Sequence, residues 1–147
     1  LANKILPEVL AKAYPDRRER QIMVTETLHA MVAHDTGVEV HTKEAGVVRL
    51  ADGLDMKKGR ARIGFKHGKK DIYNISAMTI EDVRLLPATK DKPINVEIIM
   101  ADAAGIFQVD YLLKKKIKGS GLEDYIEVTA TRSHKTGKEE LIETYHL

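Results

Sequence analysis

The first third of the chain places its apolar residues at helical spacing. A stripe of four such residues predicts a first helix over residues 3–13: Ile5, Leu6, Val9 and Leu10. Pro15 ends this helix, because proline cannot continue the hydrogen-bond ladder. Asp16 and, three residues later, Glu19 form a capping-box signal for a second helix, which runs to about His34.

The second and third helices are each expected to turn an apolar stripe toward a core. In the second helix this stripe consists of Val24, Leu28, Met31 and Val32. Thr42 is placed to cap the third helix, whose expected stripe consists of Val47, Ala51 and Leu54. The adjacent stripe contains Ala45, Val48, Asp52 and Asp55. Asp52 is therefore expected to be only partly solvated.

Alternation of apolar and polar residues replaces helical spacing after about residue 79. Residues 93–100 (PINVEIIM) and 125–132 (YIEVTATR) follow this pattern and predict two half-buried strands. Between them, a helix that begins near Asp102 ends at Gly119 or Gly121. Its inward stripe is expected to be Ile106, Val109, Leu113 and Ile117. A strand, a helix and a second strand in this order are typical of a parallel pair.

Further strands over residues 80–86 and 141–145 complete a small β-β-α-β-β unit, with SHKTGK as the last hairpin turn. The chain is thus predicted to be α+β, with an all-helical unit in residues 1–78 and a small α/β extension in residues 79–147. The sequence begins with Leu1 and is helical in pattern from the start, so we expect residue 1 to lie within a helical unit that continues upstream.

Composition narrows the function classes. The 147 residues are 43% apolar, which is enough for a packed core. With 24 basic and 22 acidic residues, the net charge of +2 gives no global reason for a nucleic-acid or membrane partner, so a basic site must be local. The absence of cysteine excludes disulfides and thiolate metal sites. No apolar run reaches the roughly 20 residues that span a bilayer, and nothing resembles a signal peptide, so we expect a cytoplasmic protein without a membrane partner.

His34 and Asp52 are the first candidate site residues. Two antiparallel helices joined by a short turn can bring the end of one against the middle of the next, so both side chains could line one cleft. Spacing alone favours the alternative, a surface histidine and an ion pair between Asp52 and Arg49, three residues apart on the helix. His29 is interpreted as a structural residue and His41 as a loop residue near the cap of the third helix.

A basic run follows Asp52 directly and includes Gly59, which lets the backbone turn tightly. Its members are Lys57, Lys58, Arg60 and Arg62. Cations next to a carboxylate that binds metal suit an anionic phosphate, whereas the alternative is a solvated charged loop. A second run, Lys114, Lys115, Lys116 and Lys118, is explained by favourable charge at a helix C-terminus.

Two stretches of the chain resemble a known family. Residues 31–35 (MVAHD) and 42–62 (TKEAGVVRLADGLDMKKGRAR) resemble the closing third of an HD-superfamily metal-dependent phosphohydrolase domain. Residues 93–128, from PINVEIIM to DYIEV, are similar to the C-terminal extension of archaeal HD-domain proteins. The resemblance implies that Asp52 is the last metal ligand and that His34 is a catalytic residue near the substrate phosphate or a second metal. It also implies that the basic run binds phosphate.

The chain departs from the family pattern in its other ligands. The family's histidine and His-Asp doublet belong upstream of the segment present here, and His34-Asp35 is too close to Asp52 to be that doublet. Asp35 stands where relatives often carry a second histidine. We therefore expect the 147 residues alone to be inactive, since a catalytic metal needs about three protein ligands.

The resemblance implies a metal-dependent phosphohydrolase or phosphodiesterase that acts on a nucleotide or an RNA-like phosphate ester. Its cofactor would be a divalent metal ion, and Mg, Mn, Fe, Ni, Co and Zn all remain open. A second class is a non-catalytic module that binds nucleic acid or protein through Lys114, Lys115 and Lys116. A third is a homo-oligomerisation piece that pairs through the edges of its sheet.

Overall fold

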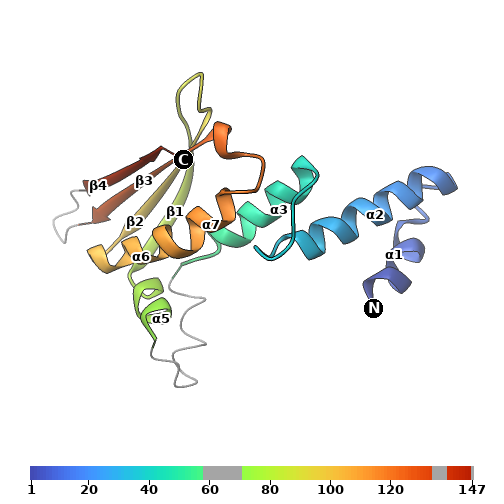
Figure 1. Cartoon of the computed structure of the whole chain (residues 1–147), viewed down its shortest axis with the longest axis horizontal. Coiled ribbons are helices and arrows are strands. Elements are labelled where there is room, and N and C mark those ends of the chain that lie inside the picture. The colour runs from blue at the N-terminus through green and yellow to red at the C-terminus, as the bar shows by residue number, and fades with distance from the viewer. Residues whose placement is uncertain (58–70, 134–138, 147) are drawn as a thin grey trace.

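The computed structural model describes residues 1–57, 71–133 and 139–146. Helices α1 (Ala2–Leu10) and α2 (Arg17–Ala33) form an arm that projects away from the sheet (Figure 1). Helix α3 (Lys43–Leu54) connects this arm to the α/β part of the molecule. The short helix α5 (Ile72–Ala77) precedes the first strand.

The predicted helix starts are confirmed. The Asp16 side chain accepts a hydrogen bond of 2.8 Å from the backbone N–H of Glu19, and it caps α2. Thr42 caps α3 in the same way, with a hydrogen bond of 3.3 Å from the N–H of Ala45. His34 is the C-terminal cap residue of α2, so this helix ends where the sequence pattern places its end.

Four strands form one sheet in the order β1-β2-β3-β4. They are β1 (Ile80–Pro87), β2 (Ile94–Met100), β3 (Ile126–Ser133) and β4 (Glu139–His146). The central pair, β2 and β3, is parallel, whereas both outer pairs are antiparallel. The α+β class and the β-β-α-β-β order are thereby confirmed. Of the predicted last hairpin turn, residues 134–138 lie outside the described residues.

The connection between the parallel strands is one continuous run of helical turns, called here the crossover helix (residues 103–117). It consists of η1 (Ala103–Gly105), α6 (Ile106–Gln108), the π-helical η2 (Val109–Leu113) and α7 (Lys114–Ile117). The Asp102 side chain caps its start by accepting a hydrogen bond from Ala104. Gly119, with φ of +80°, follows its end, as the sequence predicts.

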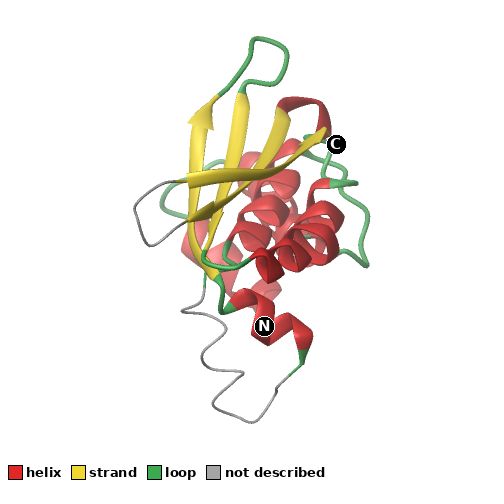
Figure 2. Cartoon of the chain, turned by 90° about the vertical axis from the view of Figure 1, so that its left-hand side faces the viewer, coloured by secondary structure: helices red, strands yellow, loops and turns green. Residues whose placement is uncertain are grey.

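The helices gather on one side of the sheet, and the core lies between the two layers (Figure 2). The predicted inward residues Val109, Leu113 and Ile117 of the crossover helix are fully buried, whereas Ile106 is only partly buried. In the parallel strands the alternating apolar residues are fully buried except Ile94, which is 39% exposed. The strand residues of this core include Ile80, Val96, Ile98, Met100, Ile126, Val128 and Ala130. Leu50 of α3 and Met56 after it join the same cluster. One core therefore spans residues on both sides of position 78/79, and the division into two units there stays a prediction.

The predicted inner faces of α2 and α3 are partly wrong. Met31, Val32 and Val47 are more than half exposed, at 51%, 56% and 54%. The buried face of α3 instead includes Arg49 and Leu50, and two glycines extend it. A Cβ atom on Gly46 would lie 2.1 Å from the Ser120 carbonyl oxygen, and one on Gly53 would lie 3.0 Å from Lys116 Cβ. Close approach of the backbones, rather than apolar volume, decides which face of α3 turns inward.

Among the helices that the structure describes, none combines the length and the apolar character that a membrane span requires.

A Gly46→Ala variant tests this close approach. The added methyl group would meet the Ser120 backbone at 2.1 Å, so α3 must shift away from the end of the crossover helix. We expect a loss of about 1–3 kcal/mol in the free energy of unfolding, measured by urea denaturation. Gly37→Ala is the matched control, because no atom lies within 4 Å of its Cβ position, and it should change stability by less than about 0.5 kcal/mol. Equal stability of the two variants would contradict the packing described here.

Candidate functional site

Asp52 lies near the end of α3, and its carboxylate binds a lysine of the crossover helix. Lys116 Nζ is 2.7 Å from Asp52 Oδ2 and donates a second hydrogen bond, of 2.6 Å, to the backbone carbonyl of His34. The Lys116 side chain is 17% exposed and that of Asp52 is 32% exposed, so the pair is partly shielded from water. The expected partial burial of Asp52 is confirmed. Within the described ranges Asp52 forms an ion pair with Lys116, whereas the Arg49 guanidinium of the alternative interpretation binds backbone carbonyls.

Arg49 holds the segments of this site together. Its guanidinium is buried and donates hydrogen bonds to four backbone carbonyls. Nε binds the carbonyl of Ala33 at 2.7 Å, and Nη2 binds those of Asp35, at 2.7 Å, and Val38. Nη1 binds the Gly119 carbonyl at 3.1 Å, beyond the end of the crossover helix. These carbonyls lie at or just after the C-terminal ends of two helices, where the helix dipole favours a cation.

The His34 ring is oriented by its own helix. Nδ1 lies 2.7 Å from the carbonyl oxygen of Met31, an acceptor, so Nδ1 carries the proton and Nε2 has the lone pair. The backbone carbonyl of the same residue binds Lys116. Lys116 thereby links the Asp52 carboxylate to the backbone carbonyl of His34, while a position of the His34 ring beside that carboxylate stays a prediction.

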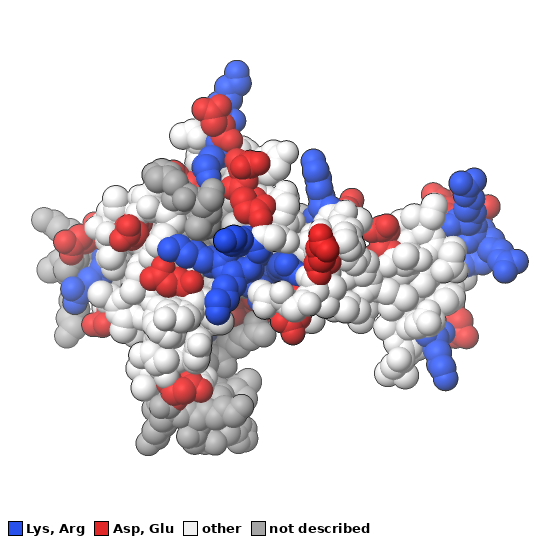
Figure 3. Space-filling model, viewed as in Figure 1, with Lys and Arg blue, Asp and Glu red and all other residues white. Residues whose placement is uncertain are grey.

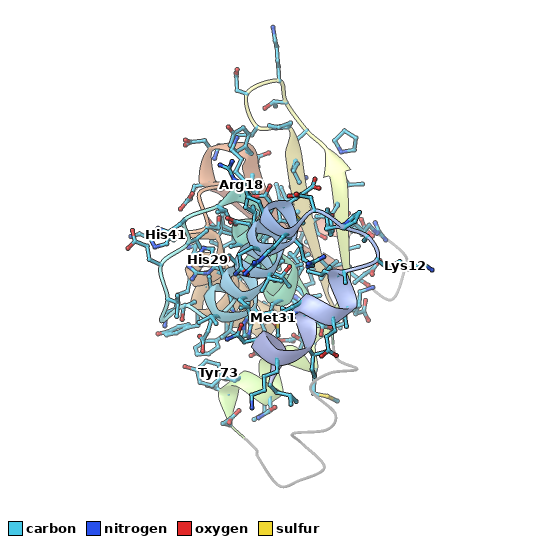
Figure 4. All side chains as sticks on the ribbon, turned by 90° about the vertical axis from the view of Figure 1, so that its right-hand side faces the viewer. Lys12, Arg18, His29, Met31, His41 and Tyr73 are labelled. Atoms are coloured by element: carbon cyan, nitrogen blue, oxygen red, sulfur yellow. The ribbon has the colours of Figure 1, made fainter. Side chains whose placement is uncertain are left out.

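His29 and His41 form a separate pair on the arm side of the molecule (Figure 4). Their rings stack with centroids 5.4 Å apart, and the backbone N–H of His41 donates a hydrogen bond of 3.1 Å to His29 Nε2. This contact ties the loop before α3 to α2. The contacts agree with the structural role expected of His29, and His41 lies in the loop just before the Thr42 cap, as expected.

The basic run after Asp52 is described only at its first member. Lys57 forms an ion pair with Asp82 of β1, and this hydrogen bond lowers the pKa of the Asp82 carboxyl. Lys58, Arg60 and Arg62 lie outside the described residues. The phosphate-binding role of the run stays a prediction.

The lysines at the end of the crossover helix gather at the middle of one face of the molecule, over α7 (Figure 3). Lys114 pairs with Asp110 at 2.8 Å, and its Nζ lies 4.1 Å from the centre of the Tyr145 ring. Burial and the nearby Asp110 carboxylate raise the pKa of Tyr145. Because Lys114 and Lys116 both bind carboxylates within the chain, the three lysines expected to contact a partner are not equivalent. Among the described residues, Lys115 makes no ion pair with a carboxylate.

The sequence singles out Arg49 and Lys116 for other roles but does not reveal the contacts that they make in this site. The spacing of Gly46, Arg49, Leu50 and Gly53 is helical, but glycine and arginine are not read as a core-facing stripe. Lys116 is separated from Asp52 by 64 positions and is accounted for locally by the helix dipole. No local pattern connects the two.

The described residues do not form a complete metal site. They contain no group of three or more histidine, aspartate or glutamate side chains arranged to hold a metal ion. A catalytic metal needs about three protein ligands, and Asp52 and His34 are the two candidates within the described ranges. The described residues therefore fit a divalent metal ion only in part. Asp52 offers a carboxylate oxygen as one ligand, and residues outside the described ranges would have to provide others.

The comparisons with known proteins supply a relative but no function. The chain is 43% identical to an uncharacterized protein of Methanocaldococcus jannaschii over 130 residues, which cover 88% of this chain and 49% of the relative. It therefore spans about half of the relative's length. No family model matches the chain, and no solved structure matches it. The HD-superfamily resemblance stays a prediction.

Replacing Arg49 tests its role as the link between segments. Arg49→Met removes the guanidinium hydrogen bonds to four backbone carbonyls, so we expect a loss of about 2–4 kcal/mol in the free energy of unfolding. Arg49→Lys keeps the charge but not the planar fork, and should recover only part of this loss. Arg20→Met is the control, because Arg20 also binds two carbonyls, those of Tyr14 and Pro15, but only within the arm. A loss at Arg49 no larger than at Arg20 would argue against the role assigned here.

The ion pair between Lys116 and Asp52 can be measured with a double-mutant cycle. Lys116→Met, Asp52→Asn and the double variant should give a coupling energy of about 0.5–1 kcal/mol in thermal or urea unfolding. The pair Lys114–Asp110, whose side chains are 36% and 41% exposed, is the reference and should give about 0.3–0.5 kcal/mol. A coupling energy at Asp52 that is indistinguishable from zero would mean that Lys116 does not hold this carboxylate in solution.

Proposed function

We propose that this chain is part of a phosphohydrolase that acts on a nucleotide or an RNA-like phosphate ester, with a divalent metal ion as its cofactor. Asp52 is one ligand of that ion, and His34 is a catalytic residue beside it. The observation that carries the proposal is the Lys116 ammonium group, which lies 2.7 Å from the Asp52 carboxylate and 2.6 Å from the His34 backbone carbonyl. The resemblance of residues 31–62 to the closing third of an HD domain gives the reaction class.

The surroundings of Asp52 favour positive charge. The carbonyls at the end of α2 carry the negative end of its dipole, and Lys116 and Arg49 both donate to carbonyls there. A carboxylate on the neighbouring helix strengthens this preference. A divalent cation needs oxygen atoms that carry negative charge, as the Lys116 ammonium group does, so the ion would have to displace that group from Asp52.

A divalent ion, when bound, polarises the phosphoryl group and lowers the pKa of a bound water molecule. The residues of this chain would bind the metal ion and the substrate phosphate and would orient them. With Nδ1 fixed on the Met31 carbonyl, the Nε2 atom of His34 is the one that accepts or returns a proton. Lys57, together with Lys58, Arg60 and Arg62, would neutralise the substrate phosphate.

The proposal is tested on the complete gene product and on these 147 residues in parallel. The assay measures hydrolysis of p-nitrophenyl phosphate esters and nucleoside monophosphates with Mn²⁺, Mg²⁺, Co²⁺, Ni²⁺ or Zn²⁺. The 147 residues alone should show no turnover, since they offer too few ligands. In the complete product, Asp52→Asn should lower kcat at least about 100-fold, and His34→Gln should lower it by a similar factor.

His41→Gln is the control for the histidine variant, because His41 is bound to His29 and not to Asp52. It should leave kcat unchanged. Full activity of Asp52→Asn in the complete product would overturn the proposal. So would turnover by the 147 residues that survives loss of this carboxylate.

A further inference from the structure

An aromatic surface lies on the outer side of the crossover helix. Phe107 and Tyr111 stack with ring centroids 4.2 Å apart and an interplanar angle of 20°. Tyr73 of α5 meets both rings edge-on, at 5.3 and 6.5 Å. Tyr73 and Tyr111 remain 44% and 46% exposed, so these large rings are not absorbed into the core. We call Tyr73, Phe107 and Tyr111 the aromatic platform.

Two lysines continue the platform toward the end of the helix. Lys115 is one turn after Tyr111 on the crossover helix, and Lys118 follows the end of that helix. Lys115 Nζ lies 5.7 Å from the centre of the Tyr111 ring. Lys115 and Lys118 are exposed, and neither forms an ion pair within the described ranges. Their charges are available, in contrast to those of Lys114 and Lys116.

The backbone beneath the platform is unusual. Residues Val109–Leu113, which include Tyr111, form a π-helical turn inside an otherwise tighter helix. Such turns are rare, and they occur frequently at functional sites because they redirect side chains. Here the π turn carries Tyr111, while Val109 and Leu113 of the same turn stay buried.

We propose that the aromatic platform with Lys115 and Lys118 binds single-stranded nucleic acid, with bases stacked on the tyrosines and phosphates on the lysines. Stacking on exposed aromatic rings beside a basic track is the general mode by which single strands are bound without sequence readout. A protein partner fits less well, because lysine is depleted at the centres of protein interfaces. This inference rests on the proposed function, from which it takes the substrate class, a nucleotide or RNA-like phosphate ester. It specifies that this substrate is single-stranded.

The platform adjoins the candidate site through one helix. Lys116, the residue after Lys115, holds the Asp52 carboxylate, so the strand-binding face and the Asp52 face are neighbouring faces of the crossover helix. A strand that lies along Tyr111 and Lys115 is thereby directed along the helix toward its end, where Lys116 binds Asp52 and the carbonyl of His34.

The test measures binding in EDTA, where no hydrolysis interferes, so its failure is distinguishable from failure of the hydrolase proposal. The probe is fluorescein-labelled single-stranded RNA of about 12 nucleotides, followed by fluorescence anisotropy, with the same DNA sequence and an RNA duplex as further arms. We expect the single strands to bind more tightly than the duplex. Tyr111→Ala should weaken binding about five-fold or more, and Tyr111→Phe should retain it, since phenylalanine also stacks.

Lys115→Gln should reduce the slope of log affinity against log salt concentration by about 0.7, because one fewer counterion is released from a single strand. The controls are Tyr125→Ala and Lys43→Gln. Tyr125 is equally exposed and has Lys43 Nζ at 5.7 Å from its ring, but this pair lies between α3 and the start of β3. Neither control should change affinity.

Three outcomes would overturn the proposal. The first is absence of binding to any single strand at low salt. The second is binding that Tyr111→Ala and Tyr125→Ala weaken equally. The third is a dimer that Tyr111→Ala converts to a monomer in light scattering without any RNA binding, which would assign the platform to a second copy of this chain.

Discussion

Arg49 brings a full positive charge into the interior of the molecule, and the fold must supply acceptors for it. A buried guanidinium without partners is far too costly to keep, so the segments that offer carbonyls are held around it. These segments are the end of α2, the turn after it and Gly119, which is 70 positions away in the sequence. The hydrogen bonds of one side chain thereby fix how the helical arm meets the α/β part. The carbonyl dipoles, those at helix C-terminal ends among them, stabilise the charge, and no carboxylate of the described residues pairs with it.

The position of Asp52 follows from this arrangement. Arg49 and Asp52 are one turn apart on α3, so fixing the first against the end of the crossover helix places the second beside Lys116. Gly46 and Gly53 allow the close approach that both contacts need, since a Cβ atom at either position would press on residues 116–120. Lys116 in turn reaches back to the carbonyl of His34. The candidate site is therefore a consequence of how α3 packs, and not of the turn between α2 and α3 alone.

The elements were predictable where their causes are local. Caps such as Asp16 and Thr42, the alternation in β2 and β3 and the glycine after the crossover helix all act within a few residues. The inner face of α3 was not predictable in this way, because the helix packs through glycines and an arginine. The apolar pattern therefore assigned Val47 to the core, whereas this residue is exposed. The partner of Asp52 was equally hidden, since it comes from an element 64 positions away. Local patterns identify elements, whereas the packing of α3 is decided by backbone distance.

The crossover helix has three neighbours, and each receives a different kind of side chain. Toward the sheet it presents aliphatic residues such as Leu113, toward α3 it presents Lys116, and toward solvent it presents Tyr111 and Lys115. A regular helix repeats every 3.6 residues, so its stripes stay in register along its length. The π turn Val109–Leu113 shifts this register, so residue spacing alone does not place the side chains before and after it on one face. The contacts do: Val109 and Leu113 are buried, whereas Tyr111 stacks on Phe107 and its ring lies 5.7 Å from Lys115 Nζ on the exposed side.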